Sequence, residues 1–384
     1  MRFEFATATR IVFGPGTLDE LGPLARSLGR RALLVTGRAP ERASAVRERL
    51  AAASVDDVTF AVAGEPTIED VRRGTALARR AELDLVVACG GGSALDAGKA
   101  IAALVVNPGD PLDYLEVVGR GRPLERPPLP FVAIPTTAGT GSEVTRNAVL
   151  SSPEHRAKAS LRHPSLLARA ALIDPELLSG LPPRVVAASG LDAFTQLVEP
   201  FVSLRANALV DGLCREGIAR SARSLRRAFA GELSQAVRVD LALASLFGGL
   251  ALANAGRGAG HGIAGPVGGM FDAPHGAACA ALLAAVVRAN VQALKTREPR
   301  NPALARYHEV AGIVTGRADA GSVELVAWIE ALVTALQVPG LSRWGVSEAD
   351  LPALVEKARV ASSMKGNPIA LDDRELAEIV RTSL

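Results

Sequence analysis

The 384-residue chain is poor in cysteine, in aromatic residues and in long apolar runs. Its three cysteines, Cys89, Cys214 and Cys279, are widely spaced among small or apolar residues, which predicts buried reduced thiols rather than disulfides. The longest apolar run, around residues 277–287, is shorter than the roughly 18 residues that a membrane span needs. A signal-peptide core is also missing. These absences predict a cytoplasmic protein with no membrane partner.

Charge of one sign is scarce as well. The formal net charge is only +3, and no basic run is interleaved with aromatic residues, so nucleic acid is not an expected partner. Hydrophobic residues make up 48% and charged residues 22% of the chain, which excludes the disordered and collagen-like classes. The length is sufficient for two domains with substantial cores.

Short β-rich runs alternate with helical stretches in the first half of the chain. Strands are predicted at residues 32–36, 83–89 and 131–135, and helices at 43–53 and 68–81. This alternation is typical of a parallel sheet covered by helices.

Strand signals fade after Arg184, while helical periodicity continues. Helices are predicted at residues 245–254, 277–291, 323–336 and 373–382. The two prolines after Leu181 are the predicted joint. The sequence therefore predicts an α/β dinucleotide-binding domain with a parallel sheet at residues 1–181, and an all-helical domain for metal and substrate at residues 182–384.

Four polar residues of the second half have the chemistry of a metal site. Asp192 and Gln196 lie four apart in a helical segment and would project from one face. His261 and His275 flank a glycine- and proline-rich stretch that is expected to interrupt any helix and to let both imidazoles face one point. Such a set suits Zn²⁺ or Fe²⁺ acting as a Lewis acid. The alternative is a pair of core histidines that only hydrogen-bond.

Two glycine-rich loops follow predicted strands in the first half. In one, a buried strand runs into Gly90-Gly91-Gly92 and then into a helix whose first turns hold Ser93, Asp96 and Lys99; Gly91, Gly92 and Ser93 offer backbone N–H groups to a pyrophosphate. The other offers the hydroxyls of Thr136, Thr137, Thr140, Ser142 and Thr145. Loops at strand ends are where open α/β sheets bind nucleotides. The alternative for the first loop is a tight turn without a ligand.

Lysine is rare, so the positions of Lys99 and Lys158 are of interest. A compact ammonium at either position would serve a diphosphate or a ribose hydroxyl, and the alternative is a solvated surface lysine.

Together these motifs resemble the iron-containing, or group III, alcohol dehydrogenase family, which includes relatives similar to glycerol dehydrogenase and maleylacetate reductase. The matching motifs are, in chain order, Arg10-Ile-Val-Phe-Gly-Pro-Gly-Thr-Leu, Gly90-Gly-Gly-Ser-Ala-Leu-Asp, Pro135-Thr-Thr-Ala-Gly-Thr-Gly-Ser-Glu, Gly190-Leu-Asp-Ala, Pro274-His-Gly and Asn367-Pro. The resemblance implies hydride transfer between a nicotinamide and a primary alcohol or aldehyde, assisted by a metal. It assigns pyrophosphate to Gly90, Gly91, Gly92 and Ser93, other nucleotide contacts to Thr136, Thr137, Thr145 and Lys158, and the metal to Asp192, His261 and His275.

The chain departs from this family at three places. Gln196 stands where alcohol dehydrogenases of the family usually have a histidine, so a weaker neutral ligand is expected there. Gly265 stands where the family often has a second histidine that relays protons. Gly37-Arg38 stands where NAD-preferring relatives place an aspartate; without that carboxylate, and with Arg38 or Arg42 to pair a 2′-phosphate, NADPH is expected to be accepted at least as well as NADH.

Two other activities stay open at this point. One is a maleylacetate-reductase-like reaction with little need of metal, and the other is a non-redox or silent nucleotide-binding member of the same fold. The substrate, beyond a small aldehyde or alcohol, does not follow from the sequence. By the resemblance, the chain is expected to form a homodimer or a larger assembly.

Overall fold

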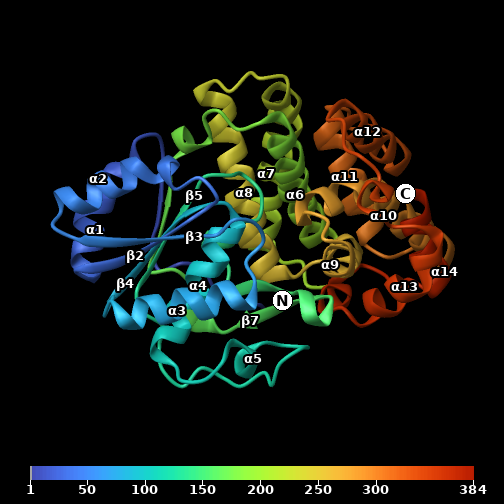
Figure 1. The fold of residues 1–384 in the computed structure, drawn as a ribbon. Coiled ribbons are helices and arrows are strands. Elements are labelled where there is room, and N and C mark those ends of the chain that lie inside the picture. The colour runs from blue at the N-terminus through green and yellow to red at the C-terminus, as the bar shows by residue number, and fades with distance from the viewer. Residues whose placement is uncertain (1) are drawn as a thin grey trace. The chain divides into compact units, whose positions relative to one another are not determined.

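The chain forms two compact units in the computed structural model, which describes residues 2–384. One unit contains residues 6–137 and 141–179, and the other contains residues 180–384 with residues 138–140 and the first residues up to Phe5. The first unit carries a parallel sheet covered by helices, and the second is built from helices (Figure 1). The predicted fold class is confirmed.

Six parallel strands form the sheet of the first unit. Their order across the sheet is β1 (Ile11–Phe13), β8 (Ala170–Ile173), β5 (Phe131–Pro135), β4 (Leu85–Gly90), β2 (Arg31–Thr36) and β3 (Asp56–Ala61). The helices of this unit are α1 (Leu21–Leu28), α2 (Ser44–Ala52), α3 (Ile68–Arg80), α4 (Gly92–Val106) and the short α5 (Pro111–Tyr114). An antiparallel pair that the sequence analysis does not predict, β6 (Asn147–Ser152) and β7 (Ala157–Arg162), makes a second sheet.

The central strands are apolar because helices cover both faces of the sheet. Every residue of β4 and β5 is buried, and so is every residue of β2 except Arg31. Helix α3 shows how local sequence sets a boundary: Thr67 and Asp70 form a reciprocal capping box at its start. The helix then ends at Arg80, one residue before the predicted end.

Nine α-helices make up the second unit, with short 3-10 helices only between α12 and α14. They are α6 (Pro183–Val202), α7 (Ala208–Phe229), α8 (Gln235–Ala255), α9 (Ala259–Phe271), α10 (His275–Arg297), α11 (Ala303–Thr315), α12 (Ser322–Ala335), α13 (Leu351–Val360) and α14 (Asp373–Thr382). Helix α6 packs against α7, α8 and α10. Residues 180–384 contain no strand.

The stretch between His261 and His275 is a helix, so the prediction that its glycines and proline interrupt any helix is wrong. Helix α9 spans Ala259–Phe271 and includes Pro266. Its residues Ile263, Ala264 and Val267 are fully buried in the core shared with α10 and α13. Burial of this apolar face outweighs the weak helix propensity of the glycines.

Two helices of the second unit, α8 and α10, pass a length and apolarity test for membrane spans. In their apolar windows, however, 61% and 67% of the residues are buried inside the fold. This burial is typical of the core helices of a globular domain.

Candidate active site

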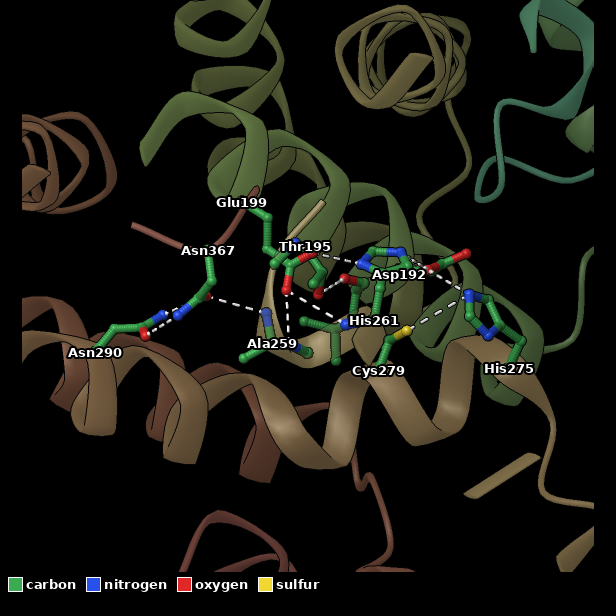
Figure 2. Close-up of polar contacts among 12 residues, drawn as sticks. Asp192, Thr195, Glu199, Ala259, His261, His275, Cys279, Asn290 and Asn367 are labelled. Carbon is green, nitrogen blue, oxygen red and sulfur yellow. Dashed lines mark hydrogen bonds and ion pairs between the residues drawn. The ribbon is translucent and has the colours of Figure 1, made fainter. Parts of the chain in front are cut away.

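Four side chains from three helices converge in the helical unit. Asp192 comes from α6, His261 from α9, and His275 and Cys279 from the first turns of α10. Their ligand atoms all lie within 4.8 Å of one another. Figure 2 shows both imidazole rings beside the Asp192 carboxylate and the Cys279 sulfur close to His275. The predicted residues Asp192, His261 and His275 therefore meet, and Cys279 joins them.

The polar atoms at the centre of this cluster lack hydrogen-bond partners. Asp192 Oδ1 lies 3.6 Å from His261 Nε2 and 3.9 Å from His275 Nε2. Both Asp192 oxygens, His261 Nε2 and Gln196 Oε1 are buried without a hydrogen bond. Leaving such an atom unsatisfied costs about 1–3 kcal/mol. The residues fit a divalent cation, which would supply the missing partner to several of these atoms at once.

Glu199 is a functional residue that the sequence analysis misses. Its Oε2 lies 2.6 Å from Nδ1 of His261, and its oxygens also accept hydrogen bonds from the backbone N–H groups of Gly258 at 2.8 Å and Gly260 at 2.7 Å. The same carboxylate thus orients the imidazole and caps the start of α9. The available signal was spacing, because Glu199 lies seven residues, or two helical turns, after Asp192.

An amide network fixes the start of α9 from its other side. Asn367 Oδ1 accepts hydrogen bonds from the backbone N–H of Ala259 at 3.1 Å and from Asn290 Nδ2 at 3.2 Å. Asn367 Nδ2 donates to Asn290 Oδ1 at 2.7 Å, and Asn290 also donates to the Tyr307 hydroxyl. All three side chains are buried, so the network holds α9, and with it His261, in one position.

The charges of the cluster support one another. Burial opposes ionisation of Asp192 and Glu199, yet His261 next to both carboxylates brings their pKa values below the usual range. Burial alone would lower the pKa of His261, but the charge of Glu199 and the contact with Asp192 raise it. Two carboxylates therefore stay anionic beside the cluster, as a cation site requires. Burial, with Asp192 and Glu199 close by, raises the pKa of the Cys279 thiol well above its ordinary value.

The glycine loops of the α/β unit meet where the strand order reverses. Strand β2 pairs with β3 on one side and with β4 on the other, so the carboxyl ends of β2 and β4 mark a topological switch point. Gly37 and Gly90 follow from these ends, and a Cβ on Gly90 would lie 3.4 Å from the Gly37 backbone nitrogen. A Cβ on Gly91 would lie 3.2 Å from Thr137 Oγ1. The absence of side chains at Gly90 and Gly91 thus lets these three loops lie close to one another.

Helix α4 presents an open N-terminus to this point. It begins at Gly92, its N-cap residue Gly91 offers no side-chain cap, and its first turn contains no acidic residue. Free backbone N–H groups and the helix dipole favour an anion at this end. Ser93, Thr136 and Thr137 are half-buried around it.

Other predicted nucleotide contacts have partners inside the α/β unit. Asp96 accepts hydrogen bonds from the Ser142 hydroxyl and from the Val149 backbone N–H. Lys99 is fully buried and donates to Thr145 Oγ1 at 3.0 Å and to the Asn147 carbonyl at 2.7 Å. Lys99 therefore ties α4 to the start of β6, which favours a structural role over both roles considered from the sequence.

The two basic residues predicted at the nucleotide are differently placed. Lys158 on β7 is half-buried and forms an ion pair with Glu65. Arg38 is exposed, and its Nε donates to the Ala63 carbonyl at 2.9 Å. Arg38 lies two residues after the end of β2, beside the reversal of strand order.

Comparison with known proteins agrees with this geometry. The family described as iron-containing alcohol dehydrogenase matches residues 8–175, and the C-terminal part of that family matches residues 186–384. The chain belongs to this family. It is accordingly an oxidoreductase of the class that interconverts alcohols and aldehydes with a nicotinamide cofactor and the assistance of a metal.

Similar members of the family differ in their named substrates. A long-chain-alcohol dehydrogenase of Geobacillus thermodenitrificans is 41% identical over 291 residues, 72% of each chain. The crystal structure of a 1,3-propanediol oxidoreductase covers 100% of both chains with a TM-score of 0.91 and 33% identity. A sulfoacetaldehyde reductase from Bifidobacterium kashiwanohense, solved with NAD⁺, covers 100% of this chain and 99% of its own with a TM-score of 0.87 and 26% identity.

Proposed function

We propose that this protein transfers a hydride reversibly between NAD(P)H and a small aldehyde or primary alcohol, with a divalent metal, Fe²⁺ or Zn²⁺, held by Asp192, His261 and His275. The observation that carries the proposal is that buried ligand atoms without a hydrogen bond, on Asp192 of α6 and His261 of α9, lie within 4.8 Å of the ligand atoms of His275 and Cys279 on α10. Gln196 is the fourth ligand that the sequence predicts, and a neutral amide oxygen there would bind only weakly.

The residues around the cluster have distinct tasks in this reaction. When bound, the metal would polarise the substrate oxygen as a Lewis acid. Glu199 holds His261 through Nδ1, which leaves Nε2 as the nitrogen that faces the metal site. Gly265 has no side chain that could move a proton, and a Cβ there would meet no atom within 4 Å. Water or the cofactor ribose would then carry the alcohol proton.

The nucleotide would be held by residues 1–181, and the metal and substrate by residues 182–384. Gly90, Gly91, Gly92 and Ser93 would bind the pyrophosphate at the start of α4, with Gly37, Asp96, Thr136, Thr137, Thr145 and Lys158 as the other predicted contacts. The sulfoacetaldehyde reductase solved with NAD⁺ supports a nicotinamide dinucleotide here. Because Arg38 stands after β2 without a carboxylate beside it in the sequence, NADPH is expected to serve at least as well as NADH.

The first experiment is elemental analysis of protein purified without chelator, on wild type and on His261→Ala. About one zinc or iron per wild-type chain, lost in the variant, is expected. If both proteins lack metal even after metal is added back, the proposed metal site of Asp192, His261 and His275 is refuted. The maleylacetate-reductase-like or non-redox alternatives are then favoured. Light scattering on the same samples tests the proposed homodimer or larger assembly.

A further inference from the structure

A fourth donor lies beside the three proposed ligands, and it is a thiol. Cys279 is fully buried one turn after His275 on α10, and its Sγ lies 3.7 Å from His275 Nε2. The sulfur is also within 4.8 Å of the ligand atoms of Asp192 and His261. Cys89 and Cys214 are equally buried, but only Cys279 among the three cysteines lies in such a cluster.

The spacing of the four donors matches that of ligands to one ion. Ligands bound at about 2.0–2.3 Å in a tetrahedral site lie about 3.3–3.6 Å from one another. Three of the six separations, 3.6 Å, 3.7 Å and 3.9 Å, equal or slightly exceed this range, and every pair of the four donors lies within 4.8 Å. The unpartnered oxygens of Asp192 and the unpartnered Nε2 of His261 lie in the same cluster and have no other group to satisfy them.

Gln196 is placed less favourably for this role. Its Oε1 would lie 3.5 Å from a Cβ on Gly248, so the amide oxygen is packed close to the backbone of α8. An uncharged amide oxygen is also a weaker ligand for Zn²⁺ than a thiolate, so Gln196 is the less favourable fourth donor.

We propose that the Cys279 thiolate, rather than Gln196, completes the metal-binding set with Asp192, His261 and His275, and that this soft ligand makes the site selective for Zn²⁺. The inference rests on the proposed function, because it assumes a metal at this cluster. On binding, the Cys279 Sγ–H bond breaks, the proton passes to solvent and Sγ bonds to the metal without any oxidation or reduction. Thiolate favours zinc over the harder ions that prefer oxygen ligands.

Cobalt(II) substitution tests the ligand directly, without use of enzymatic activity. Metal-free full-length protein is titrated with Co²⁺, and a thiolate-to-cobalt charge-transfer band in the near ultraviolet is expected beside the visible ligand-field bands. Cys279→Ser and Cys279→Ala should lose the charge-transfer band. The matched control Cys214→Ala, which also removes a buried thiol of the helical unit, should keep it, and so should Gln196→Ala.

Zinc affinity gives a second readout. Competition with a chromogenic chelator is expected to show binding weakened by about tenfold or more in Cys279→Ala, and unchanged in Cys214→Ala. Ligand-field bands without a charge-transfer band in wild type would overturn the Cys279 inference and leave the metal site of the proposed function standing. Failure of wild type to take up any Co²⁺ or Zn²⁺ would overturn both.

Discussion

The Glu199 carboxylate joins His261, a proposed metal ligand, to the start of the helix that carries it. Oε2 of Glu199 lies 2.6 Å from His261 Nδ1, and the same side chain accepts hydrogen bonds from the backbone N–H groups of Gly258 and Gly260. The imidazole is thereby held in one tautomer, with Nε2 left toward Asp192. A single residue of α6 thus sets the position and the orientation of a proposed metal ligand on α9.

Glu199→Gln is therefore expected to weaken metal binding by about 10–100-fold, as is usual when the partner of a metal-bound histidine is changed. Zinc competition with a chelator measures the effect, and circular dichroism checks the fold. Glu378→Gln, an exposed glutamate of α14 paired with Arg381, is the control and should bind zinc like wild type. Equal affinity in both variants would refute the orienting role of Glu199.

Gln196 offers a test of the departure from the family pattern. Gln196→His places an imidazole one turn after Asp192 and is expected to tighten Fe²⁺ binding by about tenfold or more, because it adds a strong ligand. Gln196→Ala is expected to change Zn²⁺ affinity less than Cys279→Ala does. Titration of Fe²⁺ under nitrogen and of Zn²⁺ in air measures both. A larger loss of zinc in Gln196→Ala than in Cys279→Ala would make Gln196 the ligand.

Gly91→Val tests the pyrophosphate site. The φ and ψ angles of Gly91, −75° and −175°, suit any residue, so the fold should tolerate valine. Its side chain would fill the space beside Thr137 and block the N–H groups at the start of α4. The KM for the nicotinamide cofactor is expected to rise about tenfold, equivalent to about 1.4 kcal/mol, with unchanged metal content. Gly212→Val, at an exposed glycine of α7, should leave the KM unchanged.

Arg38→Ala tests the expected use of NADPH. Loss of the guanidinium should lower kcat/KM with NADPH by about tenfold and leave the value with NADH nearly unchanged, because only NADPH carries a 2′-phosphate. Steady-state kinetics with both cofactors on one aldehyde give the ratio. A wild-type enzyme that strongly prefers NADH would contradict the prediction before any variant is made.

Glu143 is expected to make stability depend on pH. Burial raises the pKa of this carboxyl to about 7, although nearby Lys99 partly opposes the shift. The folded state therefore binds a proton that the unfolded state releases above about pH 4.5, so this contribution to stability is complete below that pH and is lost as the pH rises through 7. The full loss is about 3 kcal/mol.

Glu143→Gln should remove this loss. Denaturant unfolding at pH 5 and pH 8 is expected to show wild type losing more stability than Glu143→Gln over that interval. Glu154→Gln, at an exposed glutamate, should behave like wild type. Parallel curves for wild type and Glu143→Gln would mean that Glu143 ionises normally in the folded protein.

Patterns along the chain were enough to predict the fold class. The strands at residues 32–36 and 131–135 and the helix at residues 373–382 lie where the structure has β2, β5 and α14. These elements can be predicted from the sequence because each has a continuous apolar run or a regularly spaced apolar face, and residues that favour the end of a strand or helix bound it. The β6–β7 pair was missed because its short strands carry polar residues such as Ser151, Lys158 and Ser160.

The candidate site was only partly readable. Asp192, His261 and His275 stood out because few residues of their types occur in apolar surroundings. From the sequence, Cys279 was interpreted as a buried reduced thiol, and Glu199 was not identified as a candidate site residue. Only the spacing of Glu199 from Asp192 is a local signal, because the proposed roles of both residues depend on neighbours up to 87 residues away, as the pair Cys279–Asp192 shows.

The sequence alone was therefore sufficient to predict the two-part architecture, the glycine loops and the main types of candidate ligand. These features depend on the periodicity of apolar residues and on the chemistry of individual residues. Three features depended on packing in three dimensions. They are the helical state of α9, the hydrogen bonds from the start of α9 to Glu199, and the position of Cys279 beside His275. Burial of Ile263, Ala264 and Val267 stabilises a glycine-rich helix that propensity alone would not form, and that helix brings His261 to Asp192.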